Sequence, residues 1–99
     1  MTKEKILEVV GIHRELFAKM RICKMEFPRD EHVNPDSETD ESWALRHCHK
    51  KLDDIEQFVR EDRVEKAFRM LGFVQGCLFM TGLKTINNLK QDNRPNPTD

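Results

Sequence analysis

Residues 70–80 read Met70-Leu71-Gly72-Phe73-Val74-Gln75-Gly76-Cys77-Leu78-Phe79-Met80, and this stretch is apolar on nearly every side. A helix made from it has no polar face to turn toward water. A chain of 99 residues leaves a large fraction of its surface exposed, so such a helix needs cover. The stretch therefore predicts a helix that lies at the centre of the fold or is buried against another subunit.

The composition predicts a small soluble domain with a thin core. Charged residues make up 35% of the chain and hydrophobic residues 37%. Lys and Arg number 17 against 18 Asp and Glu, so the basic excess typical of nucleic-acid-binding proteins is missing. The N-terminus lacks the apolar run of a signal peptide, and residues 70–80 fall short of the roughly 20 residues that cross a membrane. We expect a cytoplasmic protein that binds neither nucleic acid nor a membrane.

Apolar residues recur three and four positions apart in three segments, which is the spacing of one helix face. The segments run from Lys3 to about Lys24, from about Asp40 to Glu61, and from near Val64 to Gly82. The third helix is expected to end at Gly82 because glycine readily adopts the positive φ that closes a helix. Thr85 should cap a short fourth helix from Ile86 to about Asn93.

No strand pattern or internal repeat interrupts these segments, so the fold class is all-α, with three main helices and a short fourth. Ser37 or Thr39 is expected to cap the second helix, and the link at residues 62–63 contains no Gly or Pro, which predicts a tight antiparallel hairpin. Residues 1–94 should form a single helical domain and residues 95–99 a disordered tail. Because the third helix carries more apolar surface than this chain can easily cover, we expect oligomerisation through it to complete the bundle.

Two glycines four residues apart mark one side of the third helix. Each glycine in a helix costs about 1 kcal/mol relative to alanine, so a close packing contact should offset the loss. Packing within one subunit and packing between subunits explain the pair equally well, and the same spacing forms dimer contacts in membrane helices. The residues expected at a subunit interface are Gly72, Phe73, Gly76, Phe79 and Met80.

The end of the first helix and its exit are rich in positive charge, whereas the loop that follows is acidic. Compensation of helix dipoles explains both clusters without any partner. A functional alternative is that the basic cluster binds a small phosphate ligand or an acidic protein surface. Gln75 needs a hydrogen-bond partner if it is buried, and it could pin two facing helices or touch that ligand. The candidate ligand-binding residues are Arg14, Lys19, Arg21, Lys24 and Gln75.

The histidine and cysteine side chains favour structural roles over a metal site. His49, Asp53 and Glu56 share one stripe that could form a metal or proton-transfer face, but a solvated helix surface explains it better. His13 lies in the apolar seam of the first helix, which favours a hydrogen-bonded core residue. Successive residues 47–49, His-Cys-His, point in different directions on a helix and cannot converge on one ion. Cys23, Cys48 and Cys77 are odd in number and widely spaced, which favours reduced core thiols. The sequence assigns no role to His32, and we expect no cofactor, no metal and no catalytic residue.

Two acidic pairs, Glu38 with Glu41 and Asp53 with Glu56, superficially resemble the magnesium-binding pattern of the MazG-like nucleotide pyrophosphatases. The likeness implies a metal-dependent hydrolase of nucleotides. The chain departs from the family pattern because both pairs fall on one expected helix, and the next helix offers only Glu65. Magnesium requires carboxylates that aim at one centre.

Three runs resemble small uncharacterised helical proteins of tailed bacteriophages. They are Trp43-Ala44-Leu45-Arg46-His47, the run from Glu65 to Gly76, and Thr85-Ile86 together with Asn93-Arg94-Pro95. The resemblance implies a virus-encoded regulatory protein that binds a host factor or host defence in the bacterial cytoplasm. It carries no residue of known chemical role.

A fainter likeness rests on a helical hairpin whose second helix holds Gln75-Gly76 near Phe79-Met80. In this respect the chain is similar to oligomeric phage proteins that sequester cyclic nucleotide signals. That likeness implies a homo-oligomer with ligand pockets between subunits. The sequence therefore leaves three classes open: a non-enzymatic protein that binds a host protein, a module that binds a nucleotide-like ligand, and a metal-dependent nucleotide hydrolase. We favour the first, as a homodimer or higher homo-oligomer.

Overall fold

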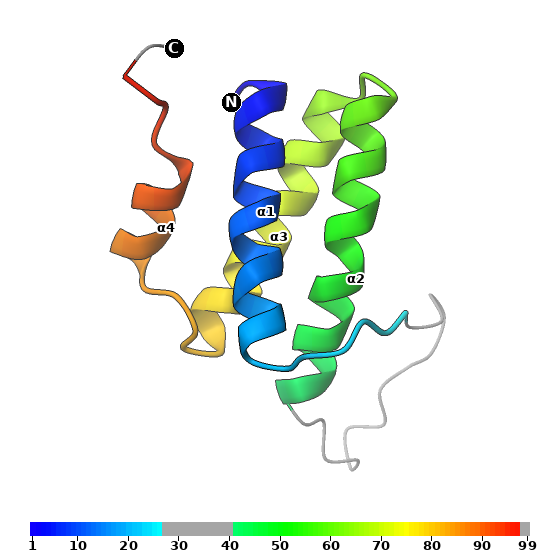
Figure 1. The fold of residues 1–99 in the computed structure, drawn as a ribbon, viewed down its shortest axis with the longest axis vertical. Helices are drawn as coiled ribbons and strands as arrows, with labels where there is room; N and C mark the ends of the chain where they lie inside the picture. The colour runs from blue at the N-terminus through cyan, green and yellow to red at the C-terminus, as the bar shows by residue number, and fades with distance from the viewer. Residues whose placement is uncertain (27–40, 98–99) are drawn as a thin grey trace.

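The computed structural model describes residues 1–26 and 41–97, and these residues form four α-helices and no strand. The helices are α1 (Lys3–Lys19), α2 (Glu41–Arg60), α3 (Val64–Met80) and α4 (Ile86–Asn93). Successive helices alternate in direction, and the described chain starts and ends at the same end of the molecule (Figure 1). The predicted all-α class, with three long helices and a short fourth, is confirmed.

The predicted end of the first helix is wrong by five residues, because α1 stops at Lys19 rather than near Lys24. Arg21 adopts a left-handed conformation with φ of 58°. Its N–H donates to the carbonyl of Ala18, and the N–H of Ile22 donates to the carbonyl of Phe17. These two bonds close the helix in a Schellman motif. No local pattern predicts this end, because the left-handed position is usually glycine.

The same motif closes the next two helices, with Asp62 (φ 62°) after α2 and Gly82 (φ 77°) after α3. The N–H of Leu83 donates to the carbonyl of Leu78, so the chain folds back against the last turn of α3. This confirms Gly82 as the closing residue and the tight hairpin at residues 62–63. The predicted bounds of α2 agree with the structure to within one residue at each end. The predicted caps Ser37 and Thr39 lie outside the described residues.

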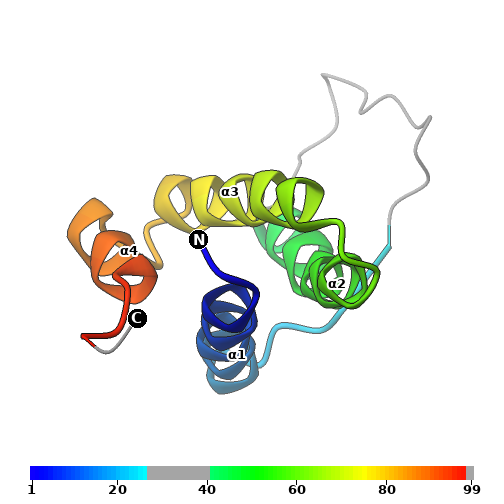
Figure 2. The same ribbon diagram turned by 90° about the horizontal axis from the view of Figure 1, so that it is seen from above.

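The core fills the space where α1, α2 and α3 face one another. Figure 2 shows α1 and α2 on one side of α3, with α4 beside α1. The buried apolar side chains are Ile6, Val9, Val10, Phe17, Leu45, Cys48, Leu52, Ile55, Val59, Ala67, Leu71, Val74, Leu78 and Leu89. The sequence predicted that α3 lies at the centre of the fold or is buried against another subunit. The first of these predictions is wrong within this chain, because only one side of α3 contributes to the core and its other side is exposed.

A capping box starts α4. The N–H of Asn88 donates to the hydroxyl of Thr85 at 3.0 Å, and the N–H of Thr85 donates to the side-chain carbonyl of Asn88 at 3.1 Å. Residues 94–97 follow as irregular chain, in which the Asn96 amide donates to Glu8 at 3.3 Å. The expected tail at residues 95–99 is thus in contact with α1 at Asn96, and residues 98–99 lie outside the described part.

Replacement of Thr85 by Ala is expected to lower the free energy of unfolding by about 1 kcal/mol, because an N-terminal N–H of α4 loses its acceptor. Urea denaturation followed by circular dichroism measures the change. Asn87→Ala is the control, since Asn87 is exposed on the same turn and takes no part in the box. Equal effects of the two substitutions would contradict the role of the cap.

Candidate functional site

The predicted basic site at the end of α1 is largely occupied by carboxylates of α2. The Arg14 guanidinium donates to Asp53 at 2.9 Å and to Glu56 at 2.5 Å, and the Lys24 ammonium binds Asp53 at 3.0 Å. The hydrogen bond from Arg14 holds the pKa of Glu56 below its ordinary value. These ion pairs join Arg14 of α1, and Lys24 after it, to α2, so the charges of these two residues are compensated within the chain.

The other predicted ligand-binding residues do not converge on that cluster. Lys19 and Arg21 are exposed at the end of α1. Gln75 is buried on α3, where its amide forms hydrogen bonds with side chains of α1 and α4. Binding of a ligand by this set stays a prediction, and its two exposed cations would have to supply the contacts.

A buried polar network joins three helices through Gln75. Its Nε2 donates to Asn93 Oδ1 at 2.7 Å, and Asn93 Nδ2 donates back to Gln75 Oε1 at 2.9 Å. The second N–H of Gln75 points to His13 Nε2 at 3.1 Å, which assigns the proton of the neutral ring to Nδ1. His13 is fully buried, and burial lowers its pKa to about 4. The expectation that His13 is a hydrogen-bonded core residue is confirmed.

His49 and Cys48 of α2 also have partners within the chain. His49 Nδ1 lies 2.7 Å from the carbonyl oxygen of Ile22, and its ring stacks on Phe17 with centroids 5.1 Å apart. Burial, helped by a contact with Cys77, raises the pKa of the Cys48 thiol. The three cysteines are free thiols, but Cys23 is exposed beyond the end of α1, so the prediction of a core thiol is wrong for Cys23. Within residues 1–26 and 41–97, no group of three His, Cys, Asp or Glu side chains could hold a metal ion.

The carboxylate pair that resembles the MazG-like pattern is neutralised within the chain. Arg14 lies against both Asp53 and Glu56, and Arg60 binds the other oxygen of Glu56 at 2.6 Å. A magnesium ion would have to displace these cations. Glu38 and the side chain of Glu41 lie outside the described part of the chain.

One face of α3 exposes large apolar side chains. Phe68, Phe73, Phe79 and Met80 are 51%, 54%, 46% and 78% exposed. Gly72 and Gly76 lie among them on the same face, and a Cβ atom placed on either glycine would meet nothing within 4 Å. Close packing within one subunit, one of the two explanations for the glycine pair, is therefore wrong. We call these six residues the α3 face.

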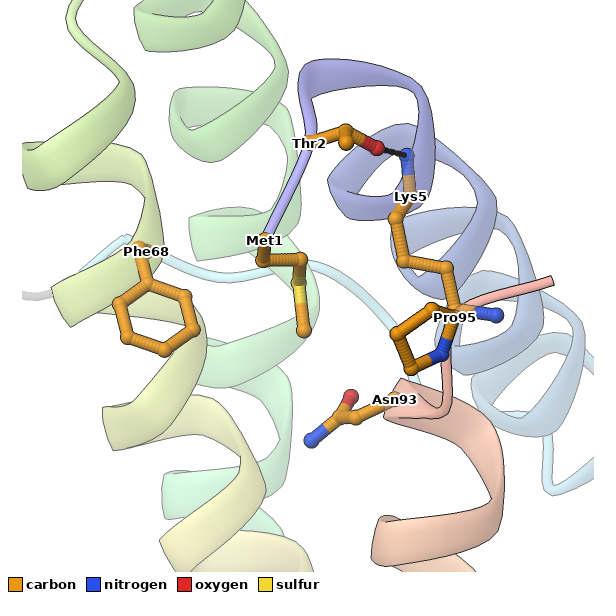
Figure 3. A pocket seen from close by; sticks show the side chains of 6 residues that line it. All are labelled: Met1, Thr2, Lys5, Phe68, Asn93 and Pro95. Atoms are coloured by element: carbon orange, nitrogen blue, oxygen red, sulfur yellow. Dashed lines mark hydrogen bonds between the residues drawn. The ribbon is translucent and has the colours of Figure 1, made fainter. Parts of the chain in front are cut away.

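A cavity of about 680 Å³ lies between the start of α1, the first half of α3 and the end of α4 (Figure 3). Met1, Phe68 and Pro95 form apolar walls, and the amide of Asn93 lies below them. The buried Lys5 contributes its aliphatic stem, while its ammonium pairs with Glu8 at 3.4 Å. The cavity is thus apolar, and its one lysine has a carboxylate partner.

A second hollow, of about 410 Å³, runs between α2 and α3. Its lining residues are His47, Lys51, Lys66, Arg69, Met70 and Phe73, and we call it the cationic groove. No pattern in the sequence predicted it. The α3 residues 66, 69, 70 and 73 show the spacing of one helix face, but nothing in the sequence placed them against Lys51 of α2.

No helix within the described ranges is long and apolar enough to cross a membrane. No family model matches the chain, and neither the curated proteins nor the solved structures with which it was compared include a similar one.

Proposed function

We propose that this chain is a non-enzymatic binding protein that acts as a homodimer, and that two copies join through the α3 face. The observation that carries the proposal is the exposure of four large apolar side chains around two glycines on that face. The phage likeness of the sequence supports the further proposal that the dimer is a virus-encoded regulator of a host factor or host defence in the bacterial cytoplasm.

The size of the α3 face supports a subunit contact. Large apolar side chains of this kind bury about 150–250 Å² each when covered, so four that are about half exposed offer roughly 400 Å². The largest apolar patch of a typical monomeric protein is about 300–600 Å² and is often a functional surface, so the α3 face has the size of such a surface. A standard interface buries about 800 Å² on each partner, with an apolar core inside a polar rim. The α3 face would supply the apolar core of such an interface.

The two glycines support a helix-to-helix contact in particular. Gly72 and Gly76 lower the stability of an isolated α3, and no other part of the described chain approaches them. A second α3 that crosses at this point could bring its backbone close to the first, because no side chain separates them. The surrounding Phe73, Phe79 and Met80 side chains would then pack on either side of the crossing.

Substitution of both glycines by alanine tests this proposal. It should stabilise the single chain but weaken the dimer. The isolated chain should gain about 1 kcal/mol per substitution, since alanine is the better helix former and its methyl group meets nothing. The dimer should weaken at least about tenfold, because two new methyl groups separate the crossing backbones. Urea denaturation of the dilute chain measures the first effect, and light scattering over a concentration series measures the second.

Gly11→Ala is the matched control, because Gly11 lies within α1 and its Cβ position is also open. It should stabilise the chain and leave the dimer unchanged. The Gly72→Ala, Gly76→Ala chain could also become more stable, as the control does, and still dimerise as tightly as the wild type. That result would rule out the α3 face as the interface.

A further inference from the structure

We propose that the cationic groove between α2 and α3 binds a small phosphate ester that carries a planar ring, such as a nucleoside phosphate. This site goes beyond the proposed homodimer, and because Phe73 also belongs to the α3 face, a bound ring and a second copy would compete for that side chain. The site also differs from the basic end of α1 that the sequence suggested, where Arg14 and Lys24 are held in ion pairs.

Positive charge converges on the groove from both helices. Lys51 enters from α2, and Lys66 and Arg69 enter from α3 one turn apart. Lys51 has a carboxylate neighbour, Asp54 at 3.3 Å, whereas Lys66 lies over the ring of Phe58, 4.6 Å from its centroid. Arg69 forms no ion pair with any residue in the described ranges, and no Asp or Glu is among the described residues that line the groove. Such a surface attracts an anion, and Arg and Lys are the usual phosphate ligands in proteins.

The groove also offers an aromatic surface beside its charges. Phe73 is half exposed, and the ring of His47 meets it edge-on, with centroids 6.3 Å apart and an angle of 89° between the planes. Burial, with the nearby charge of Lys51, lowers the pKa of His47, so the ring is neutral at pH 7. Exposed aromatic rings bind nucleobases and other planar rings by stacking. Met70 extends the apolar wall.

The groove is large enough for a small molecule. Its volume of about 410 Å³ lies within the range of about 300–1,000 Å³ typical of small-ligand sites. The larger cavity in Figure 3 lacks the charge for this chemistry, because its single lysine is paired with Glu8. A phosphate group against Arg69 and Lys66, with a ring against Phe73, matches the charge and the aromatic surface of the groove.

Calorimetric titration tests the proposal with three probes: ATP, inorganic pyrophosphate and adenosine. We expect ATP to bind more tightly than either of the others, since only ATP supplies both the ring and the phosphates. Arg69→Gln should weaken ATP binding about tenfold by removing a charge-assisted contact. Phe73→Leu should weaken it several-fold by removing the stacking surface while preserving apolar packing. Lys90→Gln is the control, because Lys90 is an exposed cation on α4 that does not line the groove, and it should leave the affinity unchanged.

All titrations are repeated in the Gly72→Ala, Gly76→Ala chain, so that ligand binding is measured apart from dimerisation. Circular dichroism of each variant establishes that it is folded. Absence of ATP binding, equal loss in Lys90→Gln and Arg69→Gln, or pyrophosphate binding as tight as ATP binding would each overturn the proposal. Binding of an acidic peptide in place of ATP would overturn it as well.

Discussion

Replacement of Phe17 by Ala is expected to destabilise the protein by about 3–5 kcal/mol, the range seen when a buried aromatic side chain is removed. Phe17 is fully buried in the core between α1 and α2, and its ring stacks on His49. Small domains have total stabilities of about 5–15 kcal/mol. The substitution should therefore remove a large part of the stability, and the variant should be partly unfolded at physiological temperature.

Thermal and urea denaturation followed by circular dichroism measure this loss. Leu7→Ala is the control on the same helix, because Leu7 is exposed, and surface substitutions usually change stability by less than about 0.5 kcal/mol. If Phe17→Ala lowered the free energy of unfolding no more than Leu7→Ala does, this would contradict the claim that the Phe17 ring packs α1 on α2.

Acid is expected to destabilise the protein by about 3 kcal/mol through His13 alone. The pKa of His13 is lowered from 6.5 to about 4, chiefly by burial, and each tenfold change in proton affinity corresponds to about 1.4 kcal/mol. The unfolded chain therefore takes up a proton near pH 6.5, whereas the folded chain resists it until about pH 4. The stability that neutral, buried His13 contributes is fully present above pH 6.5 and is lost as the pH falls from 6.5 to about 4.

The charged groups around His13 act in opposite directions, and their effects are smaller than that of burial. Asp92 raises the pKa of His13 and Lys84 lowers it, and these two form an ion pair with each other at 2.8 Å. Protonation would also place an N–H of His13 against the N–H of Gln75 and disturb the network that leads to α4.

Unfolding free energies at a series of pH values test this prediction against His13→Gln. Glutamine can accept the bond from Gln75 but does not titrate, and the carboxylates contribute equally to both proteins. The wild type should lose about 3 kcal/mol more than the variant between about pH 7 and pH 4. Parallel pH profiles would show that His13 does not titrate in this environment.

Local signals in the sequence predicted the helices well and their ends less well. Thr85 and Gly82 are residues whose chemistry starts or ends a helix, and the structure uses both as expected. Arg21 and Asp62 take the same left-handed role without being glycine. Their conformation depends on the tertiary packing of the helices that they end, which no local pattern records.

The candidate sites were harder to predict from the sequence than the ends of the helices, because they depend on contacts between residues far apart in the chain. Arg14 was grouped with other cations along α1, but its partners Asp53 and Glu56 lie 39 and 42 residues away. The cationic groove needs α2 and α3 side by side, so its residues are scattered in the sequence. The apolar character of α3 was evident from the sequence, yet it could not show which side would face the core and which would stay exposed.

The proposed function rests on the association of two chains through the α3 face. Sedimentation equilibrium of the wild-type protein, from low to high micromolar concentration, measures that association without any substitution. We predict that the measured mass rises with concentration from 11.7 kDa toward twice that value. A mass that stays at 11.7 kDa over the whole range would contradict the homodimer.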